Sequence, residues 1–315
     1  MLHVLLINTF AKPIWKRRWL WALYVALWIL NFLFLDSLTT IQNLFLLFAL
    51  AVFVIPHGAA DFYLPAWILN PPWQKRLNYW GPTLIVTFIF ATVTYAMIDL
   101  SVNFSIALFS AIIMWHWGSL DTIHIYPFRG PSWVIGSIGR GMLVVFAPLY
   151  FKPLETQELI LNLIGSDRSF ILNTLYSFSY YLLILAVALE VLALLVTKFV
   201  EGQGLPTMLP AHWMESIMLL LTFAWMTPLL SLTFYFLILH SLRHMARIPA
   251  YIPEARGQIY DGSGLMKNLS FYFQKTNFLT FLAVFSLAIW FIWNMYSGFS
   301  FSQSSTACLV PLILL

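Results

Sequence analysis

The sequence predicts an all-α, polytopic membrane protein built as a helical bundle, and three observations support this fold class. Of the 315 residues, 61% are hydrophobic and only 9% are charged, a composition far from that of a soluble domain. Apolar stretches long enough to cross a bilayer recur along almost the whole chain. The segments between them are too short for a soluble domain of useful size. We therefore predict a single transmembrane domain over residues 1–315.

Apolar length predicts eight or nine transmembrane helices, since one crossing needs about 20 apolar residues. A basic tail, residues 1–18, precedes the first span. Proline interrupts helices, so we separate the seventh and eighth spans at Thr227-Pro228. A loop, residues 247–275, precedes the last span. The candidate spans are residues 19–36, 40–60, 82–99, 103–121, 132–150, 171–197, 211–227, 228–246 and 276–296.

Lysine and arginine residues predict a cytoplasmic N-terminus. The N-terminal segment lacks the cleavage site of a signal peptide, so we expect the first span to be a retained anchor. With the N-terminus inside, the outer segments contain only Lys152 and Arg168, and residues 247–275 form a cytoplasmic loop. The inner segments contain twelve basic residues: Lys12, Lys16, Arg17, Arg18, Lys75, Arg76, Arg129, Lys198, Arg247, Arg256, Lys267 and Lys275.

Charge and cysteine content exclude two classes of function. The net charge of +4 is spread over short loops rather than gathered on one face, so we expect no nucleic-acid partner. The single cysteine, Cys308, allows neither an internal disulfide nor a thiolate metal cluster. Any metal ion must therefore be held by histidine or carboxylate.

Four histidines lie at the same end of spans that run in the same direction. His57 is near the end of the second span in VIPHGAAD, His116 is near the end of the fourth in IMWHWGSLD, and His240 and His244 are near the end of the eighth in LHSLRH. Histidines at positions i and i+4 project from the same face of a helix, so the last pair can provide two ligands for one metal ion. With one more ligand from each of the other two spans, the sequence predicts a site of four imidazoles, which suits zinc, copper, iron or nickel.

The same motifs have simpler interpretations. Each histidine can cap the last carbonyls of a helix, and each glycine in HGAAD and HWGSLD can end a helix and leave the aspartate in solvent. Alternatively, the small residues let helices approach closely, and Asp61 and Asp121 accept the second ring N–H of the nearby histidine. Two such motifs together with LHSLRH favour a metal site. His3, His124 and His212 do not share the depth of the other four within a span.

Other residues in the spans are candidates for supporting roles. Glu190 and Glu215 are expected either to accept hydrogen bonds from the ligands or to pair with Arg140 or Arg243. We prefer pairing, because a carboxylate in a span is costly to bury alone. Arg243 lies between two candidate ligands and is a further candidate neighbour of the metal. The candidates to line a substrate cavity are Trp115, Trp117 and Tyr235.

Three stretches, PHGAAD, HWGSLD and LHSLRH, are similar to the Brp/Blh family of membrane-bound β-carotene 15,15′-dioxygenases. GRGMLVVFAPLYFKPLETQELILNLIG, between the second and third, adds to the resemblance, which covers most of the chain. These bacteriorhodopsin-related proteins supply retinal to microbial rhodopsins. Each motif is short, but their order and spacing together are specific. Ser119 departs from the pattern, because many relatives have an acidic residue there, as in His-Phe-Gly-Glu-x-Asp.

The resemblance implies a non-haem Fe(II) site with His57, His116, His240 and His244 as ligands. It implies that the transmembrane domain is catalytic and adds O2 across the central double bond of β-carotene, giving two molecules of all-trans-retinal. An apolar tunnel open to the bilayer would position that bond. The implied partners are β-carotene or a related carotenoid, O2, the lipid bilayer and a retinal-binding rhodopsin. The implied location is the inner membrane of a bacterial or archaeal cell.

Other functions explain the histidines less well. A di-iron desaturase needs more histidines than the seven of this chain, in boxes such as His-x-x-His-His, which the sequence lacks. A haem-binding electron carrier could use His57 and His116 as axial ligands, and a transporter could use the histidines as a transit site for a metal. Transporters often bind their cargo near the membrane midplane, whereas these histidines lie toward one end of the spans. A rhodopsin needs an intramembrane lysine, and all seven lysines lie outside or at the margins of the spans.

Overall fold

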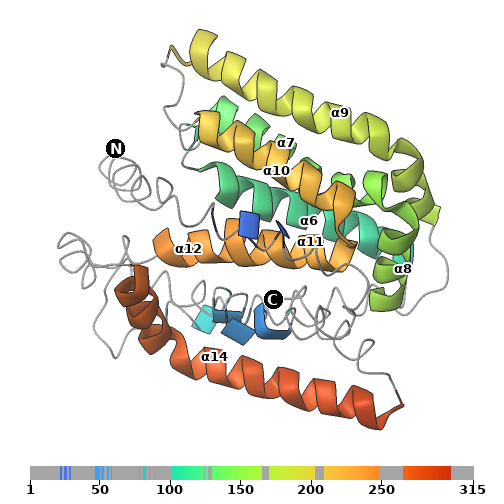
Figure 1. Cartoon of the computed structure of the whole chain (residues 1–315), viewed down its shortest axis with the longest axis vertical. Coiled ribbons are helices and arrows are strands. Elements are labelled where there is room, and N and C mark those ends of the chain that lie inside the picture. The colour runs from blue at the N-terminus through green and yellow to red at the C-terminus, as the bar shows by residue number, and fades with distance from the viewer. Residues whose placement is uncertain are drawn as a thin grey trace. The chain divides into compact units, whose positions relative to one another are not determined.

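The structure is a computed structural model that describes residues 101–123, 125–126, 130–164, 170–202, 209–247 and 265–298, together with isolated positions between residues 22 and 89. Every regular element in these ranges is helical (Figure 1), which confirms the all-α class for this part of the chain. The chain divides into two compact units. One is Met97–Tyr235, and the other combines Met1–Ala96 with Phe236–Leu315. The expectation of one catalytic domain over residues 1–315 stays a prediction.

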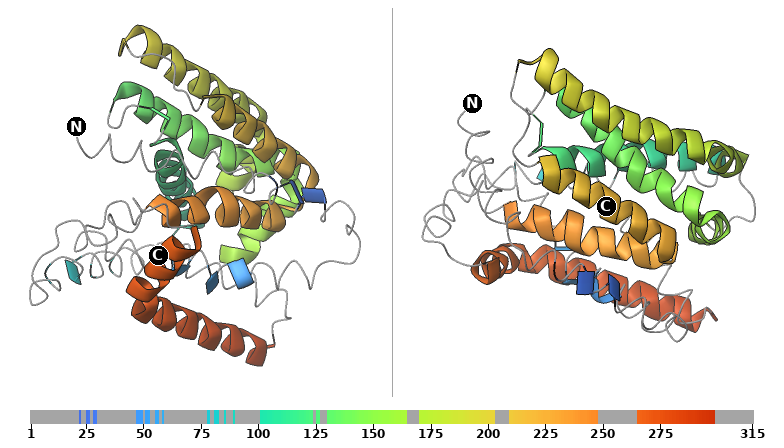
Figure 2. Two further views of the ribbon diagram at one scale, coloured as in Figure 1. Left: turned by 60° about the vertical axis from the view of Figure 1, so that its left-hand side comes forward. Right: turned by 45° about the horizontal axis from the view of Figure 1, so that its top comes forward.

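Helix α7 is the central element among the described helices of the Met97–Tyr235 unit. It contacts α6, α9, α10 and α8, and Figures 1 and 2 show it alongside α6 and α9. Helices α6, α7, α9 and α10 match four predicted spans to within two residues at each end. The short helix α8 was not predicted. The bounds are α6 Val102–Thr122, α7 Pro131–Phe151, α8 Pro153–Ile164, α9 Phe170–Phe199, α10 Leu209–Trp225 and α11 Pro228–Phe234.

Polar caps determine where α6 and α7 begin. Ser101 has an extended backbone, and its hydroxyl accepts a hydrogen bond from the backbone N–H of Phe104 at 3.3 Å, which satisfies one of the first N–H groups of α6. Pro131 occupies the first turn of α7, where a missing N–H costs nothing. The Glu201 carboxylate, just beyond α9, accepts hydrogen bonds from the backbone N–H and the hydroxyl of Ser132 at 3.0 and 2.8 Å. Glu201 therefore links the start of α7 to the end of α9.

Glycines allow α6 and α7 to pack backbone against backbone. A Cβ atom on Gly118 would overlap the carbonyl oxygen of Ser137, and one on Gly141 would overlap the carbonyl oxygen of Met114. On another side of α7, Gly139 faces the backbone of α9. Such close approach is typical of small residues in membrane helices. The glycine of HWGSLD therefore lies inside a helix and serves close packing, as one of the two interpretations predicted, rather than ending the helix.

The break between α10 and α11 occurs where proline predicts it. The hydroxyl of Thr227 accepts a hydrogen bond from the backbone N–H of Leu230 at 3.4 Å, and Pro228 occupies the first turn of α11. The chain continues as a π-helix, η3 (Tyr235–Ser241), and then as α12 (Leu242–Arg247). The predicted span 228–246 is therefore helical, but it is not a uniform α-helix. π-helical segments are rare and are frequently found at functional sites.

The described helices that lie wholly in the other unit are α12 and α14 (Leu265–Tyr296), and they contact each other. Helix α14 begins at Leu265 rather than at residue 276, so the expectation of a loop over residues 247–275 is wrong from Leu265 onward. The length of an apolar run indicates which residues can lie in lipid, but not where the helix begins. LMKNLSFYFQK contains no glycine or proline, so the helix can begin before the apolar run. The first three predicted spans lie outside the described residues, except for isolated positions.

Two of the described helices are long and apolar enough to cross a membrane, namely Pro131–Phe151 and Phe170–Phe199. A third candidate lies in α14, where the segments Tyr272–Phe278 and Thr280–Trp293 are bent by 57° relative to each other. These helices fit a membrane protein. The predicted total of eight or nine spans, the cytoplasmic N-terminus and the multi-pass topology stay predictions.

Candidate functional site

Three of the four predicted metal ligands lie in described helices. His116 is in α6 and is exposed, whereas His240 in η3 and His244 in α12 are buried, with 3% and 8% of their surfaces exposed. The ring of His240 packs edge-on against Phe236, with 6.1 Å between the ring centroids. His57 lies outside the described residues, as do Asp61 and His124. Among the residues whose positions are described, no three His, Cys, Asp or Glu side chains form a group that could hold a metal ion, so the convergence of the four histidines stays a prediction.

The chemistry of these side chains fits a ferrous ion. His240 and His244 are four residues apart, about one helical turn, and imidazole nitrogen is a suitable donor for Fe(II). The backbone of Pro56, the residue before His57, is held within the unit that contains His240 and His244, because the Tyr272 hydroxyl of α14 donates a hydrogen bond to the carbonyl oxygen of Pro56 at 2.7 Å. Both residues are buried. This unit thus contains the buried imidazoles of His240 and His244, and the backbone next to His57 is held by a hydrogen bond.

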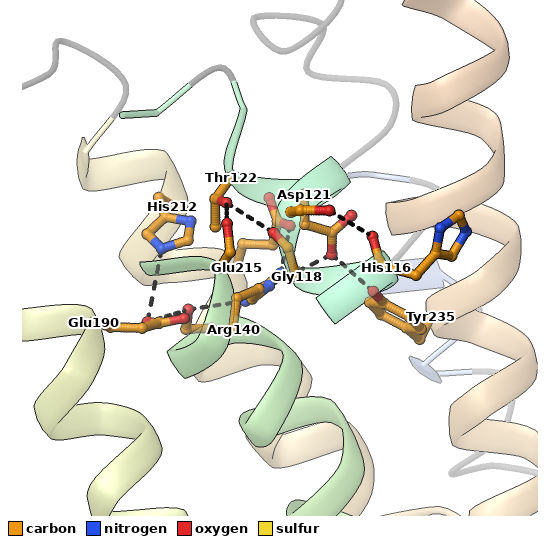
Figure 3. Close-up of polar contacts among 12 residues, drawn as sticks. His116, Gly118, Asp121, Thr122, Arg140, Glu190, His212, Glu215 and Tyr235 are labelled. Carbon is orange, nitrogen blue, oxygen red and sulfur yellow. Dashed lines mark hydrogen bonds and ion pairs between the residues drawn. The ribbon is translucent and has the colours of Figure 1, made fainter. Parts of the chain in front are cut away.

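Arg140 of α7 is completely buried, and its guanidinium contacts three groups on α6 and α10 (Figure 3). Nη2 donates a hydrogen bond to Oε1 of Glu215 at 2.6 Å, and Nη1 donates one to the hydroxyl of Ser216 at 2.9 Å. Nε lies 3.5 Å from Oδ2 of Asp121, which makes an ion pair rather than a well-formed hydrogen bond. The pairing of Glu215 with Arg140 confirms the preferred interpretation of that carboxylate.

Polar contacts continue from Ser216 to α9. The Ser216 hydroxyl donates a hydrogen bond to Oε2 of Glu190 at 3.1 Å, and Nε2 of His212 lies 3.7 Å from the same oxygen. The Tyr126 hydroxyl, between α6 and α7, donates to the backbone carbonyl of Glu190 at 3.4 Å. Burial raises the pKa of Tyr126, and Glu190 raises it further while Arg140 lowers it, so this hydroxyl is a neutral donor.

Asp121 extends these contacts to the first residue of η3. Its Oδ2 atom accepts a hydrogen bond from the Tyr235 hydroxyl at 2.9 Å, and both side chains are buried. The Tyr235 ring packs against Trp117, with 5.7 Å between the ring centroids. We call the connected set the buried polar cluster, and its members are Asp121, Arg140, Glu190, His212, Glu215, Ser216 and Tyr235.

The geometry does not favour the expected hydrogen bond from His116 to Asp121. The two residues are five apart in α6, which places them about 140° apart around the helix axis. Figure 3 shows the His116 imidazole pointing away from the Asp121 carboxylate, which faces Tyr235 and Arg140 instead. Asp121 is therefore positioned to act on the start of η3 rather than on the ring of His116.

Ser119, the residue of HWGSLD that departs from the expected motif, supports the end of α6. Its hydroxyl donates a hydrogen bond to the backbone carbonyl of His116 at 3.2 Å, and its own carbonyl accepts one from Nε1 of Trp133 at 3.2 Å. Trp115 is 44% exposed and packs edge-on against Trp133. Arg243 is buried in α12. The roles of Trp115, Trp117 and Tyr235 in lining a cavity and of Arg243 near the metal stay predictions.

His212 and Ser216 were not predicted to take part in a polar site. A usable signal was present, because His212, Glu215 and Ser216 are spaced i, i+3 and i+4 and therefore share one face of α10. Three polar residues on one face of an apolar helix indicate a polar partner on the neighbouring helix.

Comparison with known proteins assigns the sequence to a family. Residues 48–315 match the family described as beta-carotene 15,15′-dioxygenase. The chain belongs to this family. The matched region of this β-carotene 15,15′-dioxygenase family member includes all four candidate ligands and the whole buried polar cluster, which confirms the resemblance seen in PHGAAD, HWGSLD and LHSLRH. No curated protein and no solved structure matches the chain.

Proposed function

We propose that the protein is a non-haem iron dioxygenase that cleaves β-carotene at its central 15,15′ double bond. One β-carotene and one O2 give two molecules of all-trans-retinal, so all atoms are accounted for. The observation that supports this proposal most strongly is the family match over residues 48–315, a region in which the three histidine motifs follow one another in order. Apolar, membrane-length helices suit a hydrocarbon substrate that resides in the bilayer.

His57, His116, His240 and His244 are the residues proposed to hold the ferrous ion. When bound, Fe(II) supplies the redox chemistry that allows O2 to react with an alkene. The four neutral imidazoles would supply nitrogen donors to this ion. The burial of His240 and His244 about one turn apart supports their share of the site, since these two side chains can act together from one helical segment.

The protein side chains would then decide which double bond is cut. A polyene offers no polar group to bind, so its position along an apolar tunnel selects the bond that reacts. Trp115, Trp117 and Tyr235 are proposed to line that tunnel. The packing of Trp117 against Tyr235, whose hydroxyl is held by Asp121, supports a fixed position for these two rings.

A reaction with purified protein tests the proposal. Protein loaded with Fe(II) in detergent is mixed with β-carotene, with and without O2, and the pigments are separated by chromatography. We expect two molecules of retinal for each β-carotene consumed, and conversion only when O2 is present. A longer and a shorter aldehyde in equal amounts would instead show cleavage away from the central bond.

Histidine variants test the proposed ligands. His240→Ala and His244→Ala should each abolish Fe(II) binding and cleavage, whereas His124→Ala should retain both. Full activity in either of the first two variants would remove that residue from the site. Binding of Fe(II) without any conversion of β-carotene would favour a metal transporter, and a haem spectrum would favour an electron carrier.

A further inference from the structure

We propose that Arg140 is a positioning residue for the iron site. Through Asp121 it fixes the hydroxyl of Tyr235, and thereby the start of η3, the π-helix that contains His240. This inference rests on the proposed function. Arg140 would not touch iron or substrate, and its influence would pass along two contacts and one short helix.

The contacts form a direct route from α7 to η3. Nε of Arg140 lies 3.5 Å from Oδ2 of Asp121, and the same oxygen accepts the Tyr235 hydrogen bond at 2.9 Å. Tyr235 is the first residue of η3 and His240 the sixth. Hydrogen bonds in a π-helix repeat at five residues, so the two side chains are about one π turn apart. Tyr235 thus anchors the first residue of the helical segment that contains His240.

Burial explains why this route needs an arginine. The Asp121 side chain is 2% exposed, and a carboxylate removed from water is stable only beside a positive charge or several donors. Arg140 reaches Asp121 while its two terminal nitrogens donate to Glu215 and Ser216. A lysine has a single ammonium group and cannot hold three such partners in fixed directions. Glu215 and Ser216 in turn keep the guanidinium in place.

The π-helical geometry adds an independent reason for an anchor. Segments of this kind are rare, so contacts outside the backbone are expected to hold this one in register. The Tyr235 side chain provides two such contacts, the hydrogen bond to Asp121 and the ring packing on Trp117. Replacing Tyr235 by phenylalanine would remove the first contact and keep the second. This substitution therefore isolates the hydrogen bond with minimal change in volume.

A residue that only stabilises the fold differs measurably from one that positions a metal ligand. Replacing a residue that only stabilises the fold lowers the unfolding temperature, but the protein that remains folded binds metal normally. Replacing a residue that positions a metal ligand changes metal affinity in the folded protein, and loss of groups that orient metal ligands typically weakens binding about 10- to 100-fold. Fe(II) affinity, measured by competition with a chelator, is therefore the decisive readout, with kcat and KM for β-carotene and thermal unfolding measured beside it.

The test compares Tyr235→Phe, Arg140→Lys and Asp121→Ala with a matched control. Thr197→Val is the control, because Thr197 is equally buried but its hydroxyl donates only to the Ala193 carbonyl within α9, at 2.9 Å. We expect Tyr235→Phe and Arg140→Lys to weaken Fe(II) binding about 10-fold or more. Both should lower kcat with little change in KM, while Thr197→Val matches the wild type. Tyr235→Phe added to Asp121→Ala should weaken binding no further, because both act through one hydrogen bond.

The possible results separate this inference from the proposed function. If the wild type binds Fe(II) and cleaves β-carotene, but Tyr235→Phe and Arg140→Lys bind Fe(II) as tightly as Thr197→Val, the positioning role is wrong and the proposed function stands. A lower unfolding temperature with unchanged Fe(II) affinity would also overturn the positioning role alone. If the wild type binds no Fe(II), both proposals are overturned.

Discussion

Helices α7 and α9 are both long and apolar enough to cross a membrane, but their surroundings differ. In the apolar stretch of α7, 67% of the residues are buried inside the protein, compared with 22% in that of α9. Helix α9 exposes large apolar side chains such as Tyr181, Ile184 and Leu192. Its buried residues form a single stripe: Leu172, Ser179, Leu183, Ala186, Glu190, Ala193 and Thr197.

This difference shows where a membrane protein can hold charge. Arg140 is accommodated because α6 and α10 provide its partners. Glu190, in the more apolar helix, lies on the buried stripe, whose members recur mostly every three or four residues. Hydropathy therefore locates candidate spans, whereas burial locates the polar chemistry within them. The following substitutions test this contrast, in order of decreasing expected effect.

Removing the cation of α7 should have the largest effect. Arg140→Met removes the positive partner of the buried Asp121 and Glu215 carboxylates. We expect a loss of about 3 to 5 kcal/mol in the free energy of unfolding. Lys198→Met removes an exposed cation at the end of α9 and should change stability very little. Denaturant unfolding in detergent measures both. Equal effects would mean that Arg140 is not held as the contacts indicate.

Truncation of a leucine should distinguish the two helices next. Leu143 of α7 is fully buried, and Leu143→Ala should cost about 2 kcal/mol, mainly from the cavity it leaves. Leu192 of α9 is 44% exposed, so Leu192→Ala should cost about 0.5 kcal/mol or less. A larger loss for Leu192→Ala in thermal unfolding would show that another surface covers α9.

A methyl group at the contact between the two helices should have an intermediate effect. A Cβ atom on Gly139 would lie 2.9 Å from the carbonyl oxygen of Ala186, so the backbones must move apart. We expect Gly139→Ala to cost about 1 to 2 kcal/mol. Ala188→Leu adds more volume on the exposed side of α9 and should be close to neutral. If the same unfolding assay ranks these two variants in the opposite order, the packing of α7 on α9 is described wrongly.

The cap that links the two helices should contribute least. Glu201→Gln weakens the two hydrogen bonds from Ser132 at the start of α7, and we expect a loss of about 1 kcal/mol. Ser132→Ala should have a similar effect, and the double variant should lose little more than either single variant. Full additivity in a thermal double-mutant cycle would show that the two residues act separately.

Much of the helical architecture follows from the sequence because apolar length and helix-starting residues act locally. Pro131 and Pro228 mark helix starts, and four predicted spans agree with described helices to within two residues. Local signals fail where no such mark exists. No amino-acid pattern in η3 distinguishes a π-helix from an α-helix, and α8 is too short to be found by apolar length.

The candidate site is less accessible to sequence reasoning because its contacts join distant residues. The partnership of Arg140 and Glu215 could be expected from the cost of burying either charge alone. The hydrogen bond between Tyr235 and Asp121 joins residues 114 positions apart, and no local pattern indicates it. Asp121 was paired in sequence with the nearest histidine, whereas helix geometry directs its carboxylate to other helices.

Conversion of β-carotene in living cells tests the central claim most directly. The wild-type protein and the His116→Ala variant are expressed in cells that accumulate β-carotene, and the extracted pigments are separated by chromatography. We predict that the orange pigment disappears and retinal appears with the wild type, and that neither change occurs with His116→Ala. Unchanged pigment, with folded and iron-loaded wild-type protein in the membrane, would contradict the proposed function.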